Sequence, residues 1–443
     1  MKKGFYTIMS AQFFSSLADN ALFVAAVALL LAQGAPEWQR AALVPMFALF
    51  YVILAPFVGA FADALPKGRV MFISNSIKVI GCLLMLFGGH PLMAYAVVGL
   101  GAAAYSPAKY GILTELLPPS QLVKANGWIE GLTIASIILG VVLGGQLMGP
   151  VIAPHLQPLI GTVWPEGLPS PAEAAIASII VLYVIAAGFN LRIPRTVAHH
   201  HAMVVHPVEL AQDFVRCNRR LWRDKLGQIS LATTTLFWGV SGNLRYIVLA
   251  WAAVALGYDT TKASALVGVV AIGTAVGAVW ASMKMRLDRA TAVIPLGVAM
   301  GVLVLGMNLL RDVAYAVPFM ILLGGLGGFL VVPMNALLQH RGHNLMGAGR
   351  SIAVQNFNEQ ACILLLGALY AGLTTAGLSA YGAITAFGVV VALTMVAIGL
   401  WHRHNQRHHA QELDHLLEIA RNDAHHAASL QLPATAADRA DER

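Results

Sequence analysis

Long apolar stretches separated by short polar ones recur along the whole chain. Each stretch is long enough to cross the ~30 Å hydrocarbon core of a bilayer as an α-helix that rises ~1.5 Å per residue. We identify twelve such stretches: 5–32, 41–62, 70–88, 91–113, 128–150, 174–193, 229–256, 263–284, 290–310, 313–339, 348–373 and 378–401. The pattern predicts an all-α membrane protein with twelve transmembrane helices.

The composition agrees with a bilayer environment. Of the 443 residues, 58% are hydrophobic and only 11% are charged, which is too few charges for the surface of a water-soluble protein of this size. The basic start MKKGFYTIMS is typical of a signal peptide, but the apolar run that follows is too long and has Asp19 and Asn20 at its middle. We therefore expect an uncleaved first helix.

Enzyme chemistry has little support in the sequence. No Gly-Lys dipeptide occurs, so there is no Walker A loop for ATP hydrolysis. The three cysteines, Cys82, Cys217 and Cys362, are far apart and predict neither a disulfide framework nor a metal cluster. We expect no catalytic residues, no metal and no cofactor.

The basic residues are distributed unevenly between the two sides of the predicted membrane. With the N-terminus inside, 22 of the 28 Lys and Arg residues fall on the cytoplasmic side. Only Arg40, Lys262 and Arg311 fall on the other side, and Lys78, Lys109 and Arg245 lie within helices. This asymmetry predicts that both termini are cytoplasmic. The net charge of +7 then reflects topology and anionic lipid headgroups, not nucleic acid.

The chain divides into two similar halves. We predict a six-helix half over 1–193, a basic cytoplasmic linker over 194–228, a second six-helix half over 229–401 and a His-rich cytoplasmic tail over 402–443. Two segments of the first half align with segments of the second: Gly99–Gly111 with Gly325–Leu337, and Phe13–Phe23 with Leu236–Tyr246. Duplicated halves predict a transporter with its site between them near the midplane.

Two segments outside the predicted spans are amphipathic. In the linker, Val208, Ala211, Phe214 and Val215 form an apolar stripe, which predicts a helix on the inner leaflet; a solvated basic loop is the alternative. In the tail, LDHLLEIA fits either a helix lying on the surface or a solvated end.

Asp19 is the most informative charged residue in the predicted spans. A carboxylate at a helix centre costs about 2.5–3.5 kcal/mol on insertion scales, so Asp19 and its neighbour Asn20 should face the protein interior. Arg245 is the basic residue that we place at comparable depth, one helical turn from Asp19 in the repeat alignment. We therefore expect an Asp19–Arg245 pair, either as a gate between the halves or as a static ion pair.

A second polar set is predicted toward the cytoplasm, where it could bind a zwitterionic or anionic headgroup. Its members are Lys78, Tyr105, Lys109, Lys124, Glu130, Asn356 and Glu359. For Lys78 and Lys109, snorkelling toward the interface is the alternative.

GAFADALPKGR resembles the signature loop of the major facilitator superfamily, with Gly59, Asp63, Gly68 and Arg69 at the matching positions. It departs from that signature by lacking Arg directly after Asp63 and by two extra residues before Gly68. The combination of AQFFSSLADNALF, GAAAYSPAKYGILTEL, LVKANGWIEG and GGFLVVPMNALLQ resembles the bacterial lysophospholipid transporters over about residues 5–401.

This resemblance implies a flippase of the bacterial inner membrane that moves lysophosphatidylethanolamine and lysophosphatidylglycerol to the cytoplasmic leaflet. A separate acyltransferase/acyl-carrier-protein synthetase would reacylate them there. It further implies a gating role for Asp19 and Arg245 and a headgroup role for Lys124.

Two alternatives stay open. A drug–proton antiporter of the same superfamily would use Asp19 or Glu130 as its proton carrier, although Gly145 stands where its glycine-rich motif needs proline. A non-transporting membrane scaffold for an acyltransferase is the other.

Overall fold

The computed structural model describes residues 3–162, 168–194, 206–258 and 260–423, and in these ranges the chain is helical with no strand. It consists of two compact units. Unit 1 comprises Met1–Lys109 and Leu132–Arg195, and unit 2 comprises Tyr110–Gly131 and Thr196–Arg443. The helices α5 and α6 therefore contribute residues to both units.

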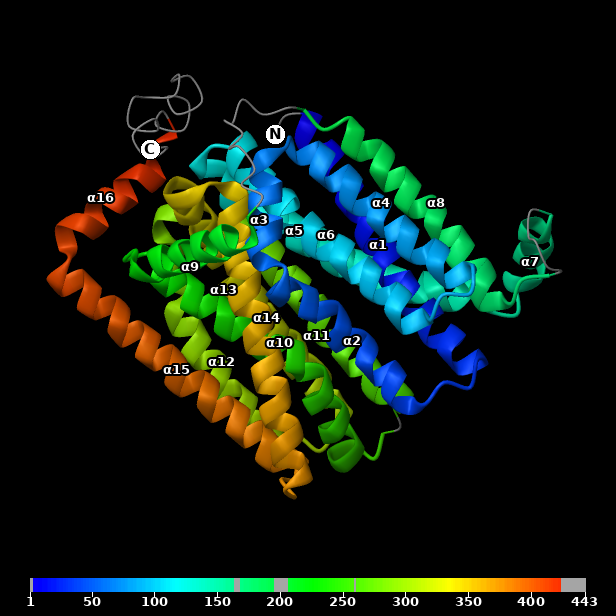
Figure 1. Cartoon of the computed structure of the whole chain (residues 1–443). Helices are drawn as coiled ribbons and strands as arrows, with labels where there is room; N and C mark the ends of the chain where they lie inside the picture. The colour runs from blue at the N-terminus through cyan, green and yellow to red at the C-terminus, as the bar shows by residue number, and fades with distance from the viewer. Residues whose placement is uncertain (1–2, 163–167, 195–205, 259, 424–443) are drawn as a thin grey trace. The chain divides into compact units, whose positions relative to one another are not determined.

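The first half of the chain contains eight helices (Figure 1): α1 (Lys3–Ala32), α2 (Glu37–Ile53), α3 (Ala55–Ala64), α4 (Lys67–Leu86), α5 (Pro91–Leu116), α6 (Pro119–Leu147), α7 (Ala153–Gly161) and α8 (Pro171–Leu191). The second half contains α9 (Pro207–Arg223), α10 (Gly227–Leu256), α11 (Thr260–Lys284), the 3-10 helix η1 (Leu287–Val293), α12 (Ile294–Gly306), the 3-10 helix η2 (Met307–Leu309), α13 (Val313–Met346), α14 (Ala348–Thr375), α15 (Ala380–His408) and α16 (Ala410–Arg421).

All twelve predicted apolar stretches coincide with a helix or with consecutive helices. Within the described residues, eight helical spans are long and apolar enough to cross a membrane, and two bent spans raise the number to ten. One bent span is α2–α3, where α3 starts at Ala55 at an angle of 64° to α2; Pro56 in its first turn has no N–H to continue the hydrogen-bonded ladder of α2. The other is α10, which bends by 46°. The chain is thus a multi-pass membrane protein.

The two predicted crossings that do not pass this test are α5 and α14. Both carry buried ionisable side chains, Lys109 in α5 and Glu359 in α14, which lower the apolar character of the helix. A total of twelve crossings therefore stays a prediction that depends on these two helices.

Close helix packing in unit 1 depends on small residues. The helices α1 and α4 both contact α8, and their shared core contains Ala18, Ala21, Leu22 and other apolar side chains. On α6, a Cβ atom at Gly140 or Gly144 would lie 2.6 Å from the Leu17 carbonyl oxygen or 2.7 Å from that of Ala21. These two glycines let the backbones of α6 and α1 approach each other.

Unit 2 repeats this device between α11 and α13. Gly273 and Gly277 of α11 face the backbones of Ile321 and Gly325, so a side chain at either glycine would collide with α13. The helices α12 and α15 form a second contacting pair, and α10 contacts α14.

The linker segment forms helix α9, as one of the two alternatives predicted, and the placement of its apolar stripe on the inner leaflet stays a prediction. The buried residues are Leu210, Cys217 and Leu221, which pack toward α10, α13 and α14. Val208 and Val215 are exposed, since 3.6 residues per turn place them on nearly the opposite face of the helix from these buried residues. Burial raises the pKa of the Cys217 thiol to about 11.

The tail forms helix α16, which docks onto unit 2, so the alternative of a solvated end is wrong for this segment. Its apolar side chains Leu413, Leu416 and Ala420 are buried. At its end, Arg421 donates to Asp288 at 3.0 Å, and the Asp423 carboxylate accepts from the backbone N–H of Ser120 at 3.1 Å and from its hydroxyl at 2.7 Å.

Candidate functional site

A buried charged cluster occupies the contact of α1, α4 and α8 in unit 1. The Lys78 ammonium donates to Asp19 Oδ2 at 2.8 Å, and the Tyr183 hydroxyl donates to Asp19 Oδ1 at 2.7 Å. Lys78 also donates to Ser15 Oγ at 3.0 Å, and Ser15 donates to Asn75 Oδ1 at 2.9 Å. We call Ser15, Asp19, Asn75, Lys78 and Tyr183 the Asp19 cluster.

Helical spacing explains why these side chains meet. Ser15 and Asp19 are four residues apart on α1, and Asn75 and Lys78 are three apart on α4, so each pair shares one face of its helix. Gly101 of α5 makes room for the lysine: a Cβ there would lie 2.7 Å from both Lys78 Cγ and the Ser74 carbonyl oxygen.

Two aromatic rings complete the surroundings of Lys78. Its ammonium lies 4.9 Å from the ring centroid of Tyr105 and 5.5 Å from that of Tyr183. The electron-rich ring faces attract the cation. Lys78 is therefore held by one carboxylate, one hydroxyl and two rings while only 1% of its side chain is exposed.

The two charged side chains of the Asp19 cluster differ in their exposure. Asp19 keeps 22% of its side chain exposed, in contrast to the buried Lys78. The Asn75 amide nitrogen is buried without a hydrogen-bond partner in the described parts of the chain. The cluster thus contains a partly exposed carboxylate (Asp19), a buried ammonium (Lys78) and an unpaired amide donor (Asn75). Together these groups can bind the opposite charges of a zwitterionic ligand.

The predicted partner of Asp19 was Arg245, and the structure places Lys78 against Asp19. The sequence argument overlooked Lys78 because it grouped this lysine with the set nearer the cytoplasm. Arg245 belongs to α10, and its side chain lies outside the described residues. The Asp19–Arg245 pair therefore stays a prediction. Asn20 points its amide back to its own helix, donating to the Ser16 carbonyl at 2.8 Å.

A second buried polar cluster lies in unit 2 and includes part of the set predicted toward the cytoplasm. Gln355 donates its amide to Glu359 Oε1 at 2.9 Å and to Asn335 Oδ1 at 3.1 Å. Asn126 donates to Gln339 Oε1 at 3.0 Å. We call Asn126, Asn335, Gln339, Gln355 and Glu359 the amide cluster. Among these five residues, Glu359 is the only one with a carboxylate, and it accepts a hydrogen bond from the Gln355 amide.

The rest of the predicted set is more dispersed. Glu130 is buried, accepts from the Tyr110 hydroxyl at 3.2 Å and interacts electrostatically with Glu359. Lys124 is exposed on the first turns of α6, Lys109 is buried, and Asn356 is half-buried. The structure therefore brings Glu130 and Glu359 together, joins Lys78 and Tyr105 to the Asp19 cluster, and leaves Lys124 on the surface.

The signature loop has an internal ion pair that the sequence argument missed. Lys67 donates to Asp63 Oδ1 at 2.8 Å and to the Ala62 carbonyl at 2.6 Å, and both charged side chains are buried. Lys67 thus supplies the cation that the loop lacks directly after Asp63. A Cβ at Gly68 would lie 2.7 Å from the Asn190 carbonyl, so this glycine lets α4 start against the end of α8. Gly59 is buried and Arg69 is exposed.

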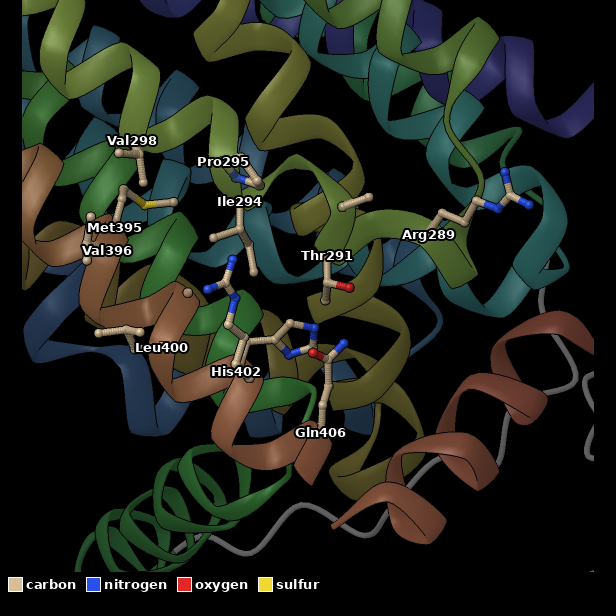
Figure 2. Close-up of a pocket in the computed structure, with 13 residues that line it drawn as sticks. Arg289, Thr291, Ile294, Pro295, Val298, Met395, Val396, Leu400, His402 and Gln406 are labelled. Carbon is tan, nitrogen blue, oxygen red and sulfur yellow. The ribbon is translucent and has the colours of Figure 1, made fainter. Parts of the chain in front are cut away.

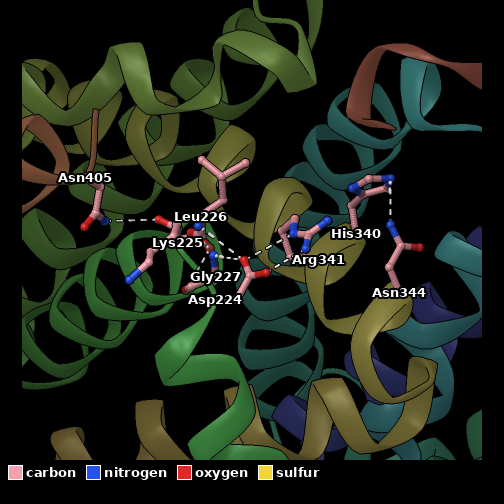
Figure 3. Close-up of polar contacts among 9 residues, drawn as sticks. Asp224, Lys225, Leu226, Gly227, His340, Arg341, Asn344 and Asn405 are labelled. Carbon is pink, nitrogen blue, oxygen red and sulfur yellow. Dashed lines mark hydrogen bonds and ion pairs between the residues drawn. The ribbon is translucent and has the colours of Figure 1, made fainter. Parts of the chain in front are cut away.

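A buried ion pair also anchors the start of α10 in unit 2 (Figure 3). Arg341 donates to Asp224 through Nε at 3.2 Å and through a terminal nitrogen at 2.6 Å. Asp224 accepts as well from the backbone N–H of Leu226 and of Gly227, which satisfies donors at the helix start. This contact was not predicted, and we assign it a structural role.

No group of three or more His, Cys, Asp or Glu side chains in the described ranges could hold a metal ion.

Comparison with known proteins identifies the class. The model of the Major Facilitator Superfamily matches residues 8–365. The human organic anion transporter MFSD10 superposes with a TM-score of 0.69 at 13% identity, covering 90% of this chain and all of that one. The transporter FucP in its outward conformation gives a TM-score of 0.66 at 12% identity, covering 90% and 98%. The chain belongs to the major facilitator superfamily.

Curated relatives narrow the family further. The lysophospholipid transporter LplT of Enterobacter sp. (strain 638) is 40% identical over 402 residues, which cover 90% of this chain and 96% of the relative. The transporters of the same name from Escherichia coli O9:H4 (strain HS) and Shigella boydii serotype 4 (strain Sb227) are 39% identical over the same shares. Within the superfamily, the chain is a member of this transporter family.

Proposed function

We propose that this protein transports lysophospholipids across the membrane, with the Asp19 cluster as part of the path of the headgroup. The proposal is supported by the 40% identity to named lysophospholipid transporters and by the match between cluster and cargo. The observation that carries it is the buried Lys78–Asp19 ion pair, whose carboxylate is partly reachable. A transporter for purely apolar cargo would not need charges in its interior, since each of them costs free energy in a membrane.

A lysophospholipid carries a charged head on a single acyl chain. Lys78 and the spare Asn75 donor suit a phosphate, and Asp19 suits an ammonium group. The tyrosine rings beside Lys78 also suit an ammonium group by cation–π attraction. We infer that lysophosphatidylethanolamine and lysophosphatidylglycerol are the substrates, and that they move to the cytoplasmic leaflet of the bacterial inner membrane. A separate acyltransferase/acyl-carrier-protein synthetase would then reacylate them, and this chain would perform no catalysis.

The predicted gate remains part of this proposal. We propose that Asp19 exchanges between Lys78 and Arg245 as access alternates. Arg245→Gln, which leaves the Lys78–Asp19 pair intact, should then lower lysophospholipid transport. Transport at the rate of the unaltered protein in this variant would argue against direct pairing.

The test is reconstitution of the full chain into liposomes with labelled lysophosphatidylethanolamine, with and without a proton gradient. We expect movement of the lysolipid and no comparable movement of diacyl phosphatidylethanolamine. Liposomes without protein provide the baseline. Gradient-driven drug efflux without lysolipid movement would contradict the proposal, and no transport of either cargo would favour a scaffold.

A drug–proton antiporter is the second candidate, and Glu359 favours it. This carboxylate is 7% exposed, interacts with the carboxylate of Glu130 and makes no ion pair within the described residues. Two neighbouring buried carboxylates are suited to binding a proton. A requirement for the gradient that disappears in Glu359→Gln, with lysolipid still moving, would assign proton coupling to the same transporter.

A further inference from the structure

A groove of about 620 Å³ runs between η1–α12 and α15 in unit 2 (Figure 2). This volume falls within the range of small-molecule sites in proteins. One part of its lining is apolar, with Ile294, Val298, Met395 and Val396 among its residues. No residue of the Asp19 cluster or of the amide cluster lines the groove.

The other part of the lining is polar and lacks partners. His402 is only 9% exposed, and its buried Nδ1 has no hydrogen-bond partner in the described chain. Arg403 and Gln406 are exposed, and among the described residues their side chains make no hydrogen bond or ion pair. Figure 2 shows the side chains of His402 and Gln406 close together at one end, with Val298, Met395 and Val396 at the other.

The charge at the polar end is not neutralised locally. Asp288, which precedes the groove in η1, already binds Arg286 at 3.2 Å and Arg421 at 3.0 Å. Arg289 also lines the groove, but Figure 2 shows its guanidinium directed away from the other lining residues. Arg403 is therefore the cation available to a ligand, and it favours one with a net negative charge.

The position of the groove determines which anion can reach it. The segments Leu287–Leu309 and Ala380–His408 are both apolar enough to cross a membrane. Their exposed apolar side chains at the groove, Val396 and Leu400, would therefore face acyl chains and not water. The polar residues lie in the last two turns of α15, where a lipid headgroup would sit.

We propose that this groove is a binding site for an anionic diacyl phospholipid of the surrounding leaflet. Its phosphate is bound by Arg403, Gln406 and His402, and one of its acyl chains lies along Ile294, Val298 and Met395. The site shares no residue with the Asp19 cluster, so it does not depend on the function proposed above.

The test uses the purified full chain in detergent, titrated with phosphatidylglycerol and followed by native mass spectrometry. We expect Arg403→Gln to weaken binding roughly tenfold, because it removes charge-assisted hydrogen bonds to the phosphate. Arg407→Gln is the matched control: Arg407 is an exposed arginine one turn further along α15 that does not line the groove. We expect it to bind phosphatidylglycerol as the unaltered protein does.

A second variant tests the apolar part without changing any charge. A Cβ at Gly399 would meet only Ile294 Cγ2, at 3.6 Å, so Gly399→Leu can extend into the groove. We expect it to lose phosphatidylglycerol binding while lysophosphatidylethanolamine transport stays unchanged.

Four results would overturn the proposal. These are equal losses in Arg403→Gln and Arg407→Gln, unchanged binding in Gly399→Leu, displacement of the lipid by inorganic phosphate alone, and tighter binding of lysophosphatidylglycerol than of the diacyl lipid. The last result would make the occupant the single-chain cargo.

Discussion

The Asp19 cluster and the amide cluster bury polar groups in different ways. In the Asp19 cluster, a carboxylate meets an ammonium at 2.8 Å and a tyrosine hydroxyl at 2.7 Å. In the amide cluster, the Glu359 carboxylate is bound by the Gln355 amide, and another carboxylate, Glu130, is nearby. The first cluster pairs its carboxylate with a cation, and the second hydrogen-bonds the Glu359 carboxylate through an amide.

This difference separates two tasks. A balanced ion pair is stable while closed, and it can open when a ligand supplies the opposite charges, as a lysophospholipid headgroup would. An amide has both a donor and an acceptor, so it can hydrogen-bond a carboxyl group in either its charged or its protonated form. We therefore expect mutations to have large effects in the Asp19 cluster and small ones in the amide cluster.

The largest effect should follow Lys78→Ala. This change leaves the partly buried Asp19 carboxylate without its cation, and loss of one partner of a buried pair costs about 3–5 kcal/mol. Thermal unfolding in detergent measures the loss, with Lys284→Ala as the control, since Lys284 is exposed at the end of α11. Equal unfolding temperatures for the two variants would show that the ion pair is unimportant.

Tyr183→Phe should lower the free energy of unfolding by less than Lys78→Ala does. It removes one hydrogen bond to a charged group, worth about 1.5–3 kcal/mol, and keeps the ring beside Lys78. The same unfolding measurement applies, and Tyr315→Phe at an exposed tyrosine is the matched control. A stability equal to that of the control would show that the hydroxyl does not stabilise Asp19.

Gly101→Ala should destabilise unit 1 by about 1–3 kcal/mol, because the added methyl group would press against Lys78 Cγ and the Ser74 carbonyl. Gly188→Ala in α8 has open space at the Cβ position and should instead be neutral or stabilising by up to about 1 kcal/mol. Denaturant titration of both variants tests the pair, and identical midpoints would contradict this packing.

The smallest effect is expected for Glu359→Gln, at less than about 1 kcal/mol, because the new amide can still accept from Gln355. Asp19→Asn should cost several times more, since it leaves Lys78 unpaired. Comparable losses in these two variants would remove the distinction between the clusters.

The helices were predictable from the sequence because a membrane requires long apolar stretches, and all twelve stretches coincide with helices. The buried position of Asp19 followed from the cost of its charge. Its partner did not follow: Lys78 reaches Asp19 because of the rotation of α4 against α1 and the space left by Gly101, and neither can be read from helix boundaries. Tyr183 was missed for the same reason, since a tyrosine in an apolar helix carries no sign of a charged neighbour.

The packing face of α9 shows a further limit of sequence reasoning. Its apolar residues cover a wide arc, so the face that contacts the protein could not be told from the exposed face that carries Val208 and Val215. The Asp63–Lys67 pair, in contrast, was within reach, because the two residues are four positions apart in the signature loop.

The central claim is that the Asp19 cluster handles the lipid headgroup. Lysophospholipid transport by a variant in which both Asp19 and Lys78 are neutral tests it most directly. Asp19→Asn combined with Lys78→Gln removes both charges together, so it should fold more stably than either single variant. Reconstituted in liposomes with labelled lysophosphatidylethanolamine, the double variant should retain its structure and lose transport. Transport at the rate of the unaltered protein would contradict the role of the Asp19 cluster in handling the headgroup.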